Sequence, residues 1–295
     1  MAASQEQGEI VTMGAQILLE GCSSEKINDG IALLIIDPQN DFHPPDGSLA
    51  VPGAVEDSQR IASLIDSNMD SIGRIVVTLD SHHPMHIGHA NFWVGQDDNT
   101  PSPFTQITAE SIRAGEWRAR DDAVQAWALI YAEQLEAGGR FTIMIWPDHC
   151  LLGSTGHAVH PVLYSALSAW STHRGRCVDW LLKGQNNLTE MYSALKAEVE
   201  IPEDPTTSLN KPMIDMLANH PKVVCCGEAK SHCVNFTVRD LLAAWPEGRA
   251  GDIVVLGDCC SPVGGFEAQA DQFEGDMKNA GVVVCTAAEC MSACQ

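Results

Sequence analysis

The stretch IALLII, residues 31–36, is an apolar run of strand length, and similar runs recur along this chain of 295 residues. Longer amphipathic stretches separate them. The other runs are RIVVTL (74–79), RFTIMIW (140–146), CVDWLL (177–182), KVVCC (222–226), DIVVLG (252–257) and GVVVC (281–285). Continuous apolar runs are typical of strands that are buried on both faces, so this pattern predicts a parallel sheet with helices on each side.

Helical spacing of apolar residues fills the intervals between the runs. The expected helices are 55–70, 111–138, 187–200, 212–220, 233–244 and 267–280. Alternation of strands and helices from end to end predicts one doubly wound α/β domain over residues 1–295. Two segments are additional to this core: an N-terminal extension, 1–30, and an insertion at about 94–140. A lid or interface role and simple surface decoration are alternatives for the insertion.

The composition is strongly acidic, with 39 Asp and Glu against 17 Lys and Arg and a formal net charge of −22. Such a chain repels phosphate backbones and anionic membranes, which disfavours nucleic-acid and membrane partners. No apolar run approaches the ~20 residues that span a bilayer. The N-terminus has no basic residue before its short apolar segments, unlike a signal peptide. We therefore expect a soluble, cytoplasmic protein.

The 11 cysteines indicate reduced thiols, because no secretory signal accompanies them, and the sequence contains no CxxC pair. Cys225 and Cys226 lie in a strand-like run, where a thiol acts as a small buried hydrophobe. Cys233 differs, since it follows the turn GEAKSH (227–232) at the start of a helical stretch. A helix N-terminus favours thiolate and offers N–H groups to an oxyanion. Cys233 is therefore a candidate nucleophile, with a structural role as the alternative.

Titratable residues follow four of the strand-like runs: Asp37, Asp80 with His82 close behind, Lys183 and, after a turn, Cys233. In an open parallel sheet, ligands bind beyond the carboxyl ends of the strands, so these residues should meet at one edge. A thiol that attacks an amide needs a base and then an acid. Asp37 could serve as both, and Lys183 could stabilise the thiolate. Turn capping by Asp37 and a surface position for Lys183 are the alternatives.

The segment DSHHPMHIGH, residues 80–89, is rich in the side chains that bind metals. Asp80 and His82 lie two apart and could both face one ion, and imidazole with carboxylate suits Zn, Fe or Mn. A polar loop without metal is the alternative. Spacing leaves the third ligand open among His83, His86, His89 and His149.

Six blocks, in order, resemble the nicotinamidase/pyrazinamidase branch of the isochorismatase-like cysteine hydrolases. They are LLIIDPQNDFHPPDGSLAVPGA (33–54), TLDSHHPMHIG (78–88), WPDHCLLGSTGHAVHP (146–161), LLKGQNNLTEMYSA (181–194), CCGEAKSHCVNFTVRDLL (225–242) and VVLGDCCSPV (254–263). The resemblance implies an α/β fold with a doubly wound, mostly parallel six-stranded sheet flanked by helices, as in Rossmann-like proteins.

The resemblance also implies a catalytic triad of Asp37, Lys183 and Cys233. In it, Asp37 shuttles the proton, Lys183 assists, and Cys233 forms a thioester with loss of ammonia. One divalent metal ion is implied, with Zn first and Fe or Mn as alternatives, and it would position the substrate through the pyridine nitrogen. Its ligands would be Asp80, His82 and His149, which leaves loop roles to His83, His86 and His89.

Further positions match the family's substrate pocket and oxyanion hole. The pocket positions are Phe42, Trp146 and Tyr192. A cis peptide between Glu228 and Ala229 would aim the Ala229 N–H into an oxyanion hole beside Cys233. The chain departs from the family at Glu228, where an apolar residue is usual, at His232, where Tyr or an apolar residue is common, and in the long stretch 93–146.

The resemblance implies hydrolysis of nicotinamide to nicotinate and ammonia by a homo-oligomer that takes a small-molecule amide. The altered residues beside Cys233 motivate an alternative, the hydrolysis of another small amide, carbamoyl or ureido compound on the same triad. Two other readings are a zinc hydrolase that uses metal-bound hydroxide and a non-enzymatic binding or redox-responsive module.

Overall fold

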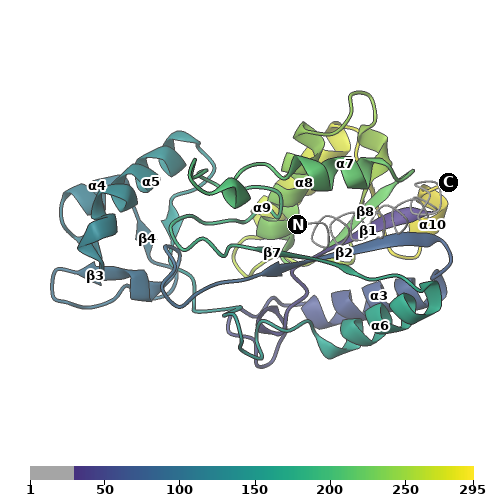
Figure 1. Ribbon diagram of the computed structural model, residues 1–295, viewed down its shortest axis with the longest axis horizontal. Coiled ribbons are helices and arrows are strands. Elements are labelled where there is room, and N and C mark those ends of the chain that lie inside the picture. The colour runs from purple at the N-terminus through teal and green to yellow at the C-terminus, as the bar shows by residue number, and fades with distance from the viewer. Residues whose placement is uncertain (1–29) are drawn as a thin grey trace, which may run out of the picture.

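The computed structural model describes residues 30–295, which are built around a six-stranded parallel sheet of strand order β10-β9-β8-β1-β2-β7 (Figure 1). The strands are β1 (Ile31–Ile36), β2 (Ile72–Asp80), β7 (Asp179–Lys183), β8 (Val223–Gly227), β9 (Ile253–Leu256) and β10 (Val283–Cys285). The predicted fold class is confirmed. The predicted extension, 1–30, lies outside the described residues apart from Gly30.

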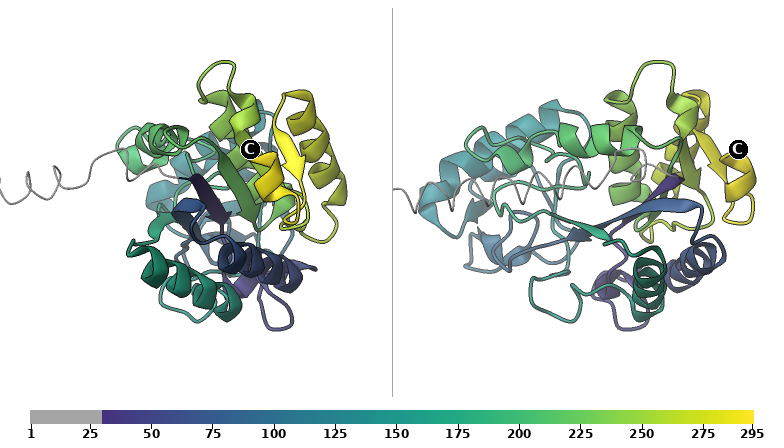
Figure 2. Two further views of the ribbon diagram at one scale, coloured as in Figure 1. Left: turned by 90° about the vertical axis from the view of Figure 1, so that its right-hand side faces the viewer. Right: turned by 45° about the vertical axis from the view of Figure 1, so that its right-hand side comes forward.

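Helices cover both faces of the sheet (Figure 2). One face carries α3 (Ala54–Ser67), α6 (Pro161–Arg174) and the short α10 (Cys290–Ala293), and the other carries α7 (Lys211–Ala218), α8 (Asn235–Ala243) and α9 (Glu267–Asn279). The packing of strand β1 on both faces explains why its sequence is apolar throughout. Alternate residues enter the two cores, Leu34 on one side and Leu33 and Ile35 on the other. Burying each such side chain contributes about 1.5–3 kcal/mol.

Residues 93–144 form a small layer of their own beyond one end of the sheet (Figure 1). Its elements are β3 (Trp93–Gly95), β4 (Gln106–Ile107), α4 (Ala109–Arg113), β5 (Trp117–Ala119), α5 (Gln125–Ala137) and β6 (Ile143–Met144). Trp93, Ile112 and Tyr131 belong to its separate apolar cluster. The predicted helix 111–138 is therefore wrong as one helix. The chain turns at Gly115, whose φ of +72° suits glycine, and then forms β5.

Two other local predictions differ from the structure. The strand expected at 140–146 is only β6, which pairs antiparallel with β4 outside the main sheet, because its apolar residues are buried inside the insertion. The helix expected at 187–200 is absent. Side chains from elsewhere satisfy its backbone instead, since the Tyr131 hydroxyl accepts from Glu190 N–H and the Thr237 hydroxyl accepts from Ala194 N–H.

Helix α6 was not predicted, although its boundaries carry recognisable signals. Pro161 stands in its first turn, and Gly175 follows its end at φ +62°. Among the described residues, no helix is long and apolar enough to cross a membrane.

Candidate active site

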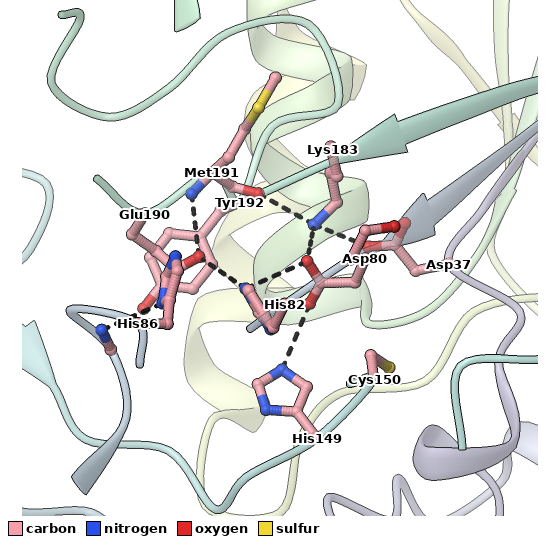
Figure 3. Close-up of polar contacts among 12 residues, drawn as sticks. Asp37, Asp80, His82, His86, His149, Cys150, Lys183, Glu190, Met191 and Tyr192 are labelled. Carbon is pink, nitrogen blue, oxygen red and sulfur yellow. Dashed lines mark hydrogen bonds and ion pairs between the residues drawn. The ribbon is translucent and has the colours of Figure 1, made fainter. Parts of the chain in front are cut away.

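Four titratable residues meet at the carboxyl edge of the sheet, and Figure 3 shows Asp37, Asp80 and Lys183 among them. Asp37 follows β1, Asp80 ends β2, Lys183 ends β7, and Cys233 lies in the turn after β8. These strands are neighbours in the order β8-β1-β2-β7. Parallel strands present their carboxyl ends on one side, so the topology alone brings the four side chains together.

The Lys183 ammonium is the centre of this group. Its Nζ lies 3.0 Å from Asp37 Oδ2 and 2.9 Å from Asp80 Oδ1, and it donates to the Met191 carbonyl at 2.9 Å. Cys233 Sγ is 3.6 Å away. Burial by itself lowers the pKa of Lys183, but the two carboxylates raise it by more than burial lowers it. The net pKa of Lys183 is therefore well above its usual range. Lys183 is therefore a buried cation that balances two buried anions.

Cys233 is a protonated thiol at rest. It is 6% exposed and lies in a π-helical turn, Lys230–Val234, that precedes α8. Burial raises the pKa of Cys233 well above its usual range, although Lys183 lowers it in part. The dipole at a helix N-terminus favours thiolate, but the loss of water around the sulfur is the larger effect. The thiol therefore needs a base at the moment of attack.

Asp37 is placed to be that base. Burial raises its pKa, Lys183 partly offsets the shift, and the net pKa is raised. A carboxylate with a raised pKa is a better proton acceptor near neutral pH. Its backbone has φ +44°, its N–H donates to the Thr78 hydroxyl at 3.0 Å, and that hydroxyl donates to Asp37 Oδ1. Thr78 thus fixes the orientation of the Asp37 carboxylate.

Imidazoles converge beside Asp80. His82, His89 and His149 offer ligand atoms that lie within 4.8 Å of one another, and a second group contains His82, His86 and Glu190. Within residues 30–295, both ring nitrogens of His82 and of His89 are buried without a hydrogen-bond partner. Buried imidazole nitrogens that make no hydrogen bond fit a divalent metal, for which neutral nitrogen is a preferred ligand.

The predicted ligands Asp80, His82 and His149 are indeed adjacent. Asp80 Oδ1 lies 3.4 Å from His82 Nε2, and Asp80 Oδ2 lies 3.2 Å from His149 Nε2. The His149 Nδ1 contacts the Pro147 carbonyl at 2.8 Å, which assigns its proton to Nδ1 and leaves Nε2 to face the site. Asp80 is shared with Lys183, so it joins the imidazole group to the thiol group.

The structure adds residues that sequence reasoning assigned to loops or did not name. His83 is exposed, but His86 and His89 are fully buried among the imidazoles. Burial lowers the pKa of His89 to about 2 and that of His86 to about 4, so both are neutral. Glu190 was not anticipated. Its Oε1 lies 3.5 Å from His82 Nε2, and it comes from the irregular segment after β7, where no spacing pattern marks it.

An apolar pocket opens between these groups. Phe42, Trp146 and Tyr192, the predicted aromatic residues, line it together with Leu49, Asp80, His82, His149, Glu190, Ala229, His232, Cys233 and Val263. The Trp146 indole donates to the Tyr192 hydroxyl at 2.9 Å. The His232 ring lies 5.2 Å from the Trp146 ring, and burial lowers its pKa to about 4. The pocket is therefore aromatic and uncharged on this side.

The peptide between Glu228 and Ala229 is cis, which confirms that expectation. The strand cysteines behave as expected too. Cys225 and Cys226 are fully buried in β8, and burial raises the pKa of Cys225 to about 12. They are inert thiols of the core, unlike Cys233.

Comparisons with known proteins agree with this geometry. No protein-family model matches the chain. Over 213 residues, 72% of this chain and 76% of the relative, it is 28% identical to a nicotinamidase of Escherichia coli strain K12. Its fold matches yeast nicotinamidase bound to the inhibitor nicotinaldehyde, with a TM-score of 0.61 and 22% identity, over 86% of this chain and 99% of that one. It also matches a zinc complex of Pyrococcus horikoshii pyrazinamidase, with a TM-score of 0.51 and 17% identity, over 86% and 98%.

The structural matches are too distant in sequence to show more than the fold. The α/β fold, with a buried thiol beside a lysine and a carboxylate, has the arrangement that a cysteine hydrolase needs. The sequence relative is a nicotinamidase, so the chain is similar to that enzyme in sequence, and the structural neighbours show that it shares their fold.

Proposed function

We propose that this protein is a nicotinamidase, which hydrolyses nicotinamide to nicotinate and ammonia through a thioester on Cys233. The observation that carries the proposal is the contact of one buried ammonium, Lys183, with both Asp37 at 3.0 Å and the Cys233 sulfur at 3.6 Å. The similarity to nicotinamidases supports the choice of amide.

The chemistry follows from the positions of the protons. Asp37 accepts the thiol proton as the Cys233 sulfur attacks the amide carbon, and the N–H groups of Ala229 and Cys233 receive the charge that develops on the oxygen. The protonated Asp37 then donates to the leaving nitrogen, and ammonia departs. Asp37 next takes a proton from water as that water attacks the thioester, which releases the carboxylate and restores the thiol. Lys183 keeps the anionic partners together throughout.

A divalent metal belongs to the proposal, with zinc as the first choice and iron or manganese as alternatives. Asp80, His82 and His149 would hold it, with His89 completing a nitrogen-rich set that suits zinc. When bound, the metal would supply a Lewis acid for the ring nitrogen of the substrate. Phe42, Trp146 and Tyr192 would hold the flat ring between aromatic walls.

The test is ammonia release from nicotinamide by the purified wild type and by Cys233→Ala, with metal content assayed on both. Cys285→Ala is the matched control, because it removes a half-buried thiol at the far edge of the sheet. We expect loss of activity only in Cys233→Ala, at unchanged metal content. Activity that survives this substitution would refute the thiol mechanism, and metal-bound hydroxide would take its place.

A second candidate is another small amide, carbamoyl or ureido substrate on the same triad. His232 favours it, since this neutral imidazole in the pocket wall offers a polar contact that an apolar residue would lack. Kinetics on a panel of such compounds decide between the two. The better substrate is the one with the higher kcat/KM.

Three broader expectations remain part of the proposal: one hydrolase domain that includes the insertion at about 94–140, a cytoplasmic location, and a homo-oligomer. Exposed Trp180 and Leu182 on β7, at the open edge of the sheet, support an interface between copies. Sedimentation of the wild type and of Trp180→Lys measures it. A monomeric wild type would contradict it.

A further inference from the structure

A pair of carboxyl groups is buried behind the pocket, outside the catalytic group. Glu228 lies between β8 and Ala229, and Asp57 lies in the first turn of α3. Each is 1% exposed, and the Asp57 carboxyl group lies close enough to raise the pKa of Glu228. Glu228 Oε1 and Asp57 Oδ2 are buried and have no hydrogen-bond partner among the described residues. Two ionised carboxylates cannot be left facing each other in this way, because each offers only acceptors.

The other oxygen of each carboxyl group contacts a donor. Arg60 Nη2 lies 2.6 Å from Asp57 Oδ1, and Ser261 N–H donates to Glu228 Oε2 at 3.3 Å. The Arg60 guanidinium places a positive charge beside Asp57, whereas Glu228 receives only a neutral donor. A single proton between the two inner oxygens therefore belongs on Glu228, which donates it to Asp57.

We propose that Glu228 is a protonated positioning residue, which fixes the loop carrying Ala229 and Cys233 to helix α3 through its hydrogen bond to Asp57. The inference rests on the proposed function, because the position of this loop matters for catalysis only if Ala229 and Cys233 take part in amide hydrolysis. It also explains why a carboxyl group stands where the resemblance leads one to expect an apolar residue.

The loop has little freedom apart from this contact. Glu228 N–H donates to the Ile36 carbonyl at 2.8 Å, and Lys230 N–H donates to the Ser261 carbonyl at 2.8 Å. A Cβ added to Gly53, at the start of α3, would lie 2.4 Å from Ser261 Oγ. Helix α3, Ser261 and the loop are therefore packed in direct contact. A displacement of the Glu228 side chain would shift Ala229, and with it the turn that carries Cys233.

Ionisation of Glu228 would break the contact. Burial, followed by the charge of Asp57, raises the pKa of Glu228 well above its usual range. Below that pKa the proton bridges the pair, and above it two anions face each other. The other titratable or charged groups around the pair are His43, Arg60, Lys230, Asp258, Cys259 and Cys260, with Glu274 on α9 behind Lys230.

The test compares Glu228→Gln, Glu228→Ala and the control Glu274→Gln. Glutamine keeps a neutral donor for Asp57 at every pH, and alanine removes it. Glu274 faces Lys230 at 3.7 Å from the other side of the same loop, so its substitution repeats the chemical change outside the pair. The measurements are kcat and KM for nicotinamide against pH, and the infrared carbonyl band of a protonated carboxyl group at neutral pH.

We expect Glu228→Gln to keep kcat close to that of the wild type and to move the alkaline decline of kcat to higher pH. Glu228→Ala should lower kcat by about 10-fold to 100-fold with little change in KM, as a small misplacement of reacting groups does. The infrared carbonyl band should lose the contribution of one carboxyl group in Glu228→Gln and should be unchanged in Glu274→Gln.

Identical infrared spectra of the wild type and Glu228→Gln would overturn the proposal, as would a wild-type kcat in Glu228→Ala. If Glu228→Ala does not fold, the pH profiles of wild type and Glu228→Gln decide alone, and coincident profiles refute it. A wild type that releases no ammonia from nicotinamide would refute the proposed function. The infrared comparison would still test the carboxyl pair.

Discussion

Replacing Lys183 by methionine keeps most of the side-chain volume and removes the cation that lies between Asp37 and Asp80. Lys183 is 2% exposed, and both ion pairs are about 3 Å long. Removing one partner of a buried pair costs about 3–5 kcal/mol, because the remaining charge has neither water nor a counter-ion. For a domain of this size that corresponds to a fall in Tm of about 6–20 °C.

The loss should depend on pH. In the variant, Asp37 can bind a proton and relieve the deficit, so the destabilisation should be larger at about pH 8 than at about pH 5. The assay is thermal and urea unfolding with a chelator present, since a metal ion beside Asp80 would replace part of the missing charge. Lys211→Met is the matched control, because Lys211 and Asp215 form an exposed pair in α7 that contributes little.

A double variant isolates the charge. Lys183→Met combined with Asp37→Asn leaves one uncompensated carboxylate fewer, so we expect it to be more stable than Lys183→Met alone. Equal Tm values for Lys183→Met and the wild type would refute the reasoning. A double variant that is no more stable than the single variant would refute it as well.

Three further outcomes are expected. Gly227→Ala should lower the unfolding free energy by at least about 1–3 kcal/mol, because φ at Gly227 is +107° and the new Cβ would lie 2.1 Å from a carbonyl oxygen of β1. Gly264→Ala is the control, because a Cβ there meets nothing within 4 Å. Urea unfolding measures the free energy of both variants. Burial raises the pKa of Glu198 from 4.5 to about 7, so folding favours the protonated form of this carboxyl group. The stability of the wild type should therefore fall as pH rises through that interval. The stability of Glu198→Gln should not show this fall. His82 belongs to both candidate ligand groups, so His82→Ala should lose bound zinc in elemental analysis, while the exposed His173→Ala should retain it.

The class of fold, and the edge of the sheet where the chemistry lies, could both be predicted from local features of the sequence. The apolar run of β1 enters two cores, and burial on both faces requires covering helices. Asp37, Asp80 and Lys183 could be located because the end of a parallel strand is a local feature of the chain. Cys225 could likewise be assigned to the core, and it is fully buried in β8.

The tertiary structure decided what depends on contacts between distant segments. The segment 187–200 has helical composition, but side chains of the insertion and of α8 satisfy its backbone and turn Glu190 towards His82. The protonation of Cys233 could not be inferred from its helix-terminal position, because burial outweighs the dipole. The proton shared by Glu228 and Asp57 joins residues that are far apart in the chain. Burial and charge pairing are properties of the packed molecule, and no spacing in the sequence encodes them.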